Sequence, residues 1–263
     1  MINLLRSDLY RLFKTKAFYV CSLVALALSA LGVFMTDWAN HMASQNPEMV
    51  STSLTSIKDG LSSGLQVFSD GNVHIFMAIF IAIFITAEFS HGTMKNAVSK
   101  GFQRYQIYLS KIVTMIVATY IMISIMFIFT TISATIVSGT FGVLTWNYLG
   151  QILAMIGVEL LLHAALTSVY VMVAMVIRNG AGVIAINIIV VNSVVPLLYM
   201  ALTYLFKNKI KFYDYGLRNN ILSYLMSLTP PGEDVVRAII VGLAFFVVTV
   251  AAGIFAFKNM DVK

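Results

Sequence analysis

The sequence predicts an all-α integral membrane protein with six transmembrane helices. Three observations carry this prediction: 59% of the 263 residues are hydrophobic, only 11% are charged, and the charges are separated by long apolar stretches. An ordinary soluble domain carries roughly 25% charged residues. The mean hydropathy of +0.88 also indicates lipid as the solvent. The single cysteine, Cys21, allows no intrachain disulfide and so excludes a disulfide-stapled secreted domain.

The six spans follow from the gaps between charges, because a bilayer core about 30 Å thick needs about 20 apolar residues per helix. The uncharged stretch between Lys111 and Glu159 is long enough for two crossings, and the glycine-containing segment 138–142 supplies the turn. A short connection that ends in Gly180, a plausible helix stop, separates the next two spans. The chain 1–263 is thus one transmembrane domain with predicted spans at 17–36, 73–88, 112–137, 149–177, 181–206 and 235–257.

The positions of the basic residues predict that both termini are cytoplasmic, because Lys and Arg concentrate on that side of a membrane. The same rule explains the net charge of +6 without a nucleic-acid partner. The cluster Lys207, Lys209 and Lys211 in the last outer loop opposes this orientation, but the early helices dominate. The basic residues assigned to the cytoplasmic side are Arg6, Arg11, Lys14, Lys16, Lys95, Lys100, Arg104, Lys111, Arg178, Lys258 and Lys263.

Residues 2–16 have the period of an amphipathic helix lying on the inner surface of the membrane. Leu5, Leu9 and Leu12 belong to its apolar face, whereas Asp8 and Arg11 belong to its polar face. A basic anchor with no further role is an equally good interpretation.

Two outer loops repeat the helical pattern without enough apolar length to cross the membrane. We expect a short helix in each, and packing on the bundle explains them at least as well as contact with cargo. The apolar positions are Val50, Leu54, Ile57, Leu61, Leu65 and Phe68 in the first loop, and Leu217, Ile221, Leu222, Leu225 and Met226 in the last.

Polar residues inside the predicted spans are candidates for a transport path. Glu159 and His163 share one helix face near the middle of the membrane, so they form either a path for cargo or protons, or a hydrogen-bonded pair that fixes packing. Asn187 and Asn192 precede Pro196, which should kink or interrupt the fifth span and could form a gate, although interhelical hydrogen bonding is the commoner role of such amides.

Motifs of catalysis are scarce. The sequence contains no P-loop, so we expect the chain not to bind ATP, and Glu159 to His163 does not match the H-E-x-x-H zinc motif. No metal site or other cofactor is predicted.

The most specific segment is the predicted cytoplasmic loop 88–111. It contains, in order, Glu88, Gly92, Thr93, Lys95, Asn96, Lys100, Gly101 and Arg104, and it ends at Lys111. This order, together with the amphipathic N-terminal helix, resembles the permease subunits of type-2 ABC exporters. The likeness is greatest to the bacitracin-resistance, lantibiotic-immunity and phenol-soluble-modulin exporter branch of that family. Gln103 departs from the pattern, because many relatives carry Ser or Thr there.

The resemblance implies a function and a set of partners. The loop would form a coupling helix that docks on a separate ATPase, with the N-terminal helix as an elbow beside it. Two permease copies, or one copy and a paralogue, would assemble with two ATPase subunits that bind ATP and Mg²⁺. The complex would export peptide or lipid-like cargo through a bacterial cytoplasmic membrane. The alternatives are an immunity or sensor protein without an ATPase and, less favoured, an intramembrane enzyme that uses Glu159 and His163.

Overall fold

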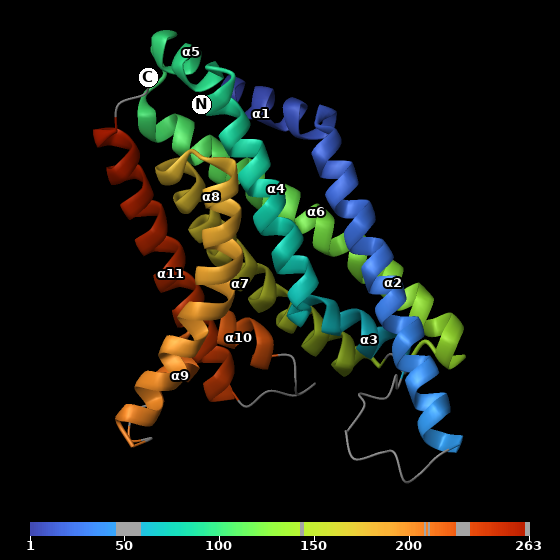
Figure 1. Cartoon of the computed structure of the whole chain (residues 1–263). Helices are drawn as coiled ribbons and strands as arrows, with labels where there is room; N and C mark the ends of the chain where they lie inside the picture. Colours follow the sequence, from blue (N-terminus) through green and yellow to red (C-terminus); the bar gives the residue numbers. More distant parts are fainter. Residues whose placement is uncertain (46–58, 143–144, 208, 210, 225–231, 261–263) are drawn as a thin grey trace.

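The structure of the chain, a computed structural model, describes residues 1–45, 59–142, 145–207, 209, 211–224 and 232–260 (Figure 1). All regular secondary structure in these residues is helical. Six helices within them are long and apolar enough to cross a membrane. The prediction of an all-α protein with six membrane-spanning helices is therefore confirmed.

The long helices exceed most of the predicted spans, because each continues past its apolar stretch into polar residues. Five crossings are single helices, and the fifth is built from three consecutive helical segments. The single helices are α2 (Lys16–Gln45), α4 (Gly71–Ser90), α6 (Arg104–Ser138), α7 (Trp146–Ile177) and α11 (Gly232–Asn259). The fifth crossing consists of α8 (Gly180–Ala185), the π-helix η3 (Ile186–Val194) and α9 (Val195–Leu205).

The remaining short helices lie at the two ends of the bundle (Figure 1). The end that holds both chain termini also holds α1 (Ile2–Lys14) and α5 (Thr93–Ser99), and we call it the terminal end. The opposite, distal end holds α3 (Gly60–Gln66) with η2 (Val67–Ser69), and η4 (Phe212–Tyr215) with α10 (Leu217–Tyr224).

Helix α7 lies at the centre of the bundle, since it packs against α4, α6, α10 and α11. In the most apolar windows of α4 and α7, 61% of the residues are buried, against 11% in the fifth crossing. No residue of α9 is buried. The core is therefore built around α4 and α7, and the fifth crossing offers an open apolar surface to lipid or to another subunit.

Helix α3 packs closely on α6 and is buried along most of its length. A Cβ atom at Gly60 or Gly64 would overlap the side chain of Thr135 or Thr131, so two glycines four residues apart allow this close approach. The apolar residues Leu61, Leu65 and Phe68 of the first predicted outer helix are buried in the core. In this part of the loop the apolar face is used for packing, whereas Val50, Leu54 and Ile57 lie outside the described residues.

The last predicted outer helix is α10. Leu217 and Ile221 on α10 are buried, so this helix also packs on the bundle rather than standing free of it. Leu225 and Met226 lie outside the described residues, and so does part of the segment that follows.

Both predicted turns occur, but the second differs in detail. Helix α6 ends at Ser138, and Gly139 takes the left-handed conformation that a helix end favours. Between α7 and α8 it is Arg178 that has a positive φ of 60°. Gly180 begins α8 and is not a stop, because the Asn179 side chain accepts a hydrogen bond from the Gly182 N–H and caps the new helix.

The fifth crossing contains a π-helix where a kink or break was predicted. Pro196 has no N–H, and it falls within the first turn of α9, directly after η3. The widened turn is held by side chains: Asn192 Nδ2 donates to the Asn187 carbonyl oxygen at 2.8 Å, and Tyr170 on α7 donates to Asn192 Oδ1 at 2.7 Å. Asn187 is fully buried, and its side-chain amide has no hydrogen-bond partner among the described residues.

Candidate functional site

The short helix α5 projects from the terminal end of the bundle (Figure 1). Gly92 and Gly101 flank it with φ values of 67° and 84°, a conformation that favours glycine. Met94 is buried, which fixes the helix to the core. The side chains of Thr93, Lys95, Asn96 and Lys100 are exposed. Helix α5 therefore presents a polar and basic surface on a short, anchored element.

Glu88, in the last turn of α4, does not belong to this exposed surface. It is buried, and Lys111 of α6 lies 2.5 Å from its carboxylate. Lys111 also pairs with Asp8 of α1, and Arg11 of α1 pairs with Glu88. Ser110 Oγ donates to Asp8 Oδ2 at 2.5 Å. The charges of Asp8, Arg11, Glu88 and Lys111 cancel, and we call these four residues the buried charge network.

The buried charge network corrects the predicted orientation of the elbow helix. Asp8 is only 5% exposed, although the helical period places it on the polar face. Arg11 Nη2 donates to the Phe84 carbonyl oxygen at 2.8 Å, and its guanidinium lies 3.7 Å from the centre of the Phe84 ring. Leu12 is buried as well, whereas Leu5 and Leu9 are half-buried. Part of the polar face of α1 thus points into the bundle, because buried partners for its charges exist on α4 and α6.

Arg104 also differs from its predicted role as a protruding docking residue. Its Nη1 donates to the Lys258 and Met260 carbonyl oxygens at 2.7 and 2.5 Å, and to that of Phe257 at 3.3 Å. The last carbonyls of a helix lack partners within the helix and attract cations. Arg104 therefore closes the C-terminal end of α11 at the terminal end of the bundle.

A second polar cluster is buried toward the distal end. Glu159 and His163 on α7 are fully buried and adjacent, as predicted, and His163 Nδ1 donates to the Glu159 carbonyl oxygen at 2.8 Å. The imidazole of His74 stacks on that of His163, with ring centres 5.2 Å apart. His74 lies in the first turn of α4, so α4 contributes to this cluster from its distal end.

Arg218 of α10 completes this cluster. Its Nη1 lies 2.6 Å from His74 Nδ1. Burial lowers the pKa of Arg218, and the nearby Tyr170 and Asp70 act in the opposite direction. Arginine remains charged at any ordinary pH. The sequence did not indicate His74 or Arg218, because their contact joins residues far apart in the chain.

Several buried atoms of the cluster have no hydrogen-bond partner among the described residues. These atoms are both carboxylate oxygens of Glu159 and the Nε2 atoms of His74 and His163. Within the described residues, no group of three or more His, Cys, Asp or Glu side chains is placed to hold a metal ion. The polar atoms of the distal cluster that are unpartnered in the described structure are available to exchange protons or to bind water.

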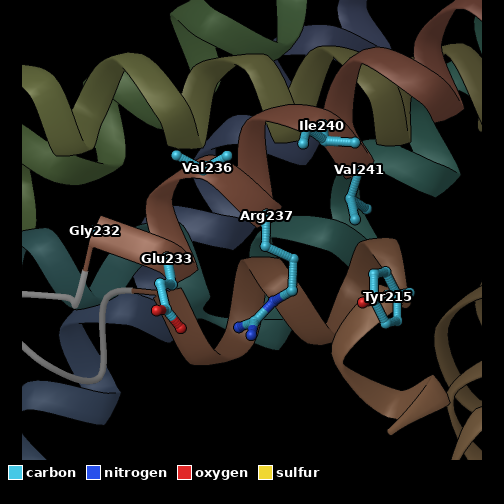
Figure 2. A pocket seen from close by; sticks show the side chains of 7 residues that line it. All are labelled: Tyr215, Gly232, Glu233, Val236, Arg237, Ile240 and Val241. Atoms are coloured by element: carbon cyan, nitrogen blue, oxygen red, sulfur yellow. The ribbon is translucent and has the colours of Figure 1, made fainter. Parts of the chain in front are cut away.

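A surface pocket of about 560 Å³ lies at the distal end beside the start of α11 (Figure 2). Val236, Ile240 and Val241 form an apolar side, and Glu233 and Arg237 give the pocket a charged rim. Arg237 pairs with Asp234 at 2.9 Å, and Tyr215 also lines the pocket. A pocket with an apolar wall and a charged rim fits an amphipathic molecule.

The fold and its two polar clusters define a multi-pass helical membrane protein. The chain belongs to the DUF2705 family, described as a protein of unknown function, and the family model matches residues 16–263. No curated protein matches the sequence.

Proposed function

We propose that the chain is the membrane-spanning permease subunit of an ABC exporter and that α5 docks on a separate ATPase subunit. The observation that carries this proposal is the position of α5: a short polar helix stands at the terminal end and is fixed to the core by Met94. Thr93 Oγ1 also donates to the Glu88 carbonyl oxygen at 3.1 Å, so the beginning of α5 is attached to the end of α4.

A force on α5 would reach three other helices through the buried charge network. Glu88, in the last turn of α4, is paired with Arg11 of α1 and Lys111 of α6, and Lys111 also pairs with Asp8 of α1. Buried ion pairs with fixed geometry resist separation, because an unpaired charge in a low-dielectric interior is costly. Binding of ATP by the partner would therefore move α1, α4, α5 and the start of α6 together.

The proposal includes a cargo class and an assembly. The pocket beside α11, with its apolar wall and charged rim, supports an amphipathic peptide or lipid-like cargo. The open surface of α9 supports contact with a second permease copy or with a paralogue. Two ATPase subunits would supply ATP and Mg²⁺ binding, and a bacterial cytoplasmic membrane with both termini inside would place α5 in contact with them.

The test is co-purification of an ATPase with the tagged chain from its native cells. The double change Lys95→Glu and Lys100→Glu should reduce the amount of bound ATPase by at least about tenfold, because it reverses charge on the exposed surface of α5. Lys258→Glu is the matched control, since Lys258 is also exposed at the terminal end. No ATPase with the unaltered chain, or equal amounts with the double variant and the control, would contradict the docking assignment.

A further inference from the structure

We propose that His74 is a proton-binding site and that binding of a proton there releases α10 from the distal end of the bundle. The inference goes beyond export and needs no ATPase. It rests on the contact between Arg218 Nη1 and His74 Nδ1, which are 2.6 Å apart. Arginine has only donors, so Nδ1 must accept this hydrogen bond, and His74 must be neutral with its hydrogen on Nε2.

Protonation of His74 turns this hydrogen bond into a repulsive contact. A protonated imidazole donates from both nitrogens, so Nδ1 can no longer accept from Arg218. Two positive groups would then face each other at hydrogen-bond distance inside the bundle, where charges are poorly screened. The carbonyl oxygen of Asp70, one helical turn before His74, interacts with the ring and can accept a hydrogen bond from it when it is protonated. The Asp70 carbonyl oxygen therefore replaces Arg218 as the partner of His74.

The groups around His74 decide how the cluster responds. Arg218 faces it from α10, and Glu159 and His163 belong to the part of α7 that packs against α4. Asp70 precedes α4, and Tyr170 of α7 is near Arg218. Glu159 has two carboxylate oxygens without hydrogen-bond partners in the described structure, so it can accept a further proton or a water molecule within the same cluster.

Besides Arg218, the described contacts of α10 include hydrogen bonds that Asn219 Nδ2 and Asn220 Nδ2 donate to the Tyr213 and Asp214 carbonyl oxygens of η4. Ser69 Oγ donates to the Ile221 carbonyl oxygen at 3.0 Å, and the side chains of Leu217 and Ile221 are buried. When Arg218 leaves His74, the guanidinium has to move toward water, and α10 has to move with it. The side chain at position 221 then becomes accessible, so its exposure reports the position of α10.

The test measures this exposure in nanodiscs, where both faces of the protein meet the same buffer. In a Cys21→Ser background, Ile221→Cys is labelled with a methanethiosulfonate reagent at pH 7.5 and at a series of lower values down to about pH 4, because burial and the contact with Arg218 oppose protonation of His74. Each rate is divided by that of Trp146→Cys, since Trp146 is 88% exposed and its rate corrects for thiol ionisation. We expect the normalised rate to rise toward the acid end of this series by about 5-fold to 150-fold, the usual range of coupling between two sites.

His74→Gln should abolish the response, because the glutamine carbonyl still accepts from Arg218 but gains no proton in this pH range. His163→Gln should retain the response. A missing response in the parent protein, an equal response in His74→Gln, or a response lost only in His163→Gln would overturn the assignment. Hydrogen exchange of the α10 amides in the unsubstituted chain gives a second measurement, so a folding defect of Ile221→Cys leaves the proposal testable. Faster exchange at the acid end of the same pH series, after correction for intrinsic rates, supports the proposal, and unchanged exchange across the series overturns it.

Discussion

Lys111, on α6, has an environment unlike that of an ordinary surface lysine. It is buried between Asp8 and Glu88, which come from two other helices. Removing one member of such a group leaves an unpaired charge inside the protein, whereas the complete group contributes little net stability. Loss of one charge from the buried charge network is therefore expected to destabilise the fold by more than the complete network stabilises it.

Asp8→Asn tests the buried charge network at the scale of one residue. The change keeps the shape of the side chain and removes one carboxylate from Lys111, so we expect a loss of about 3–5 kcal/mol in the free energy of unfolding. Arg6→Gln on the same helix should change it by less than about 0.5 kcal/mol, since Arg6 is exposed. The measurement is denaturant unfolding in detergent micelles. Equal stability of the two variants would contradict the burial of Asp8.

Some residues of the candidate site were predictable and others were not. The motif of loop 88–111 includes Glu88, but a motif does not say which side chains a carboxylate meets. The helical period placed Asp8 on the polar face, because a period separates apolar from polar residues and contains no information about buried ionic partners. The contact between His74 and Arg218 joins positions 144 residues apart, and no local pattern predicts it.

Contacts between elements depend on small residues at a few crossings. Gly253 of α11 faces Tyr108 of α6, and a Cβ atom there would overlap the tyrosine ring and hydroxyl. Tyr108 is fully buried. Adding one methyl group at Gly253 is therefore expected to disturb the packing of α11 against α6.

Gly253→Ala tests this crossing. We expect it to lower the free energy of unfolding by about 1–3 kcal/mol, the usual cost of overpacking a core. Gly157→Ala in α7 is the control, because a Cβ atom there meets nothing within 4 Å and alanine favours a helix by up to about 1 kcal/mol. Thermal unfolding of both variants gives the comparison. A Gly253→Ala protein at least as stable as the control would show that the two helices are farther apart than described.

The end of α11 depends on Arg104 in a similar way. Arg104→Gln removes the charged donor that binds the carbonyls of Lys258 and Met260, so the last turn of α11 should open more often. Hydrogen bonds to charged groups are worth about 1.5–3 kcal/mol. Amide hydrogen exchange across 255–260 should accelerate correspondingly, while exchange in the middle of α11 stays the same. Unchanged exchange in this turn would show that Arg104 does not hold the end of α11 and would favour its predicted role as an exposed docking residue.

At the scale of the whole molecule, the fold class was the most predictable property. Long gaps between charges predicted six spans, because the thickness of a bilayer imposes a minimum apolar length whatever the packing. The same argument did not predict that α3 is buried against α6, or that the fifth crossing contains a π-helix. Both depend on contacts between distant segments: Gly60 and Gly64 against α6, and Tyr170 with Asn192.

The orientation of the whole molecule is tested by labelling single cysteines in intact cells. Lys209 and Lys95 are both exposed, near the distal end and at the terminal end. In a Cys21→Ser background, Lys209→Cys should react with an impermeant maleimide from outside, and Lys95→Cys should react only after the membrane is permeabilised, because basic residues of early loops remain inside. The reverse pattern would invert the topology and remove α5 from the cytosol.

The most direct test of the permease proposal is photo-crosslinking from α5 in native membranes. A benzophenone amino acid replaces Asn96, which is exposed on α5 at the terminal end. As a control, the same amino acid replaces Trp146, which is exposed at the distal end of the bundle. The proposal predicts a crosslink from position 96 alone to a protein that contains a P-loop, with a yield that changes when ATP is added. If no such protein crosslinks from position 96, or if the same proteins crosslink from positions 96 and 146, the assignment of α5 as the docking helix is contradicted.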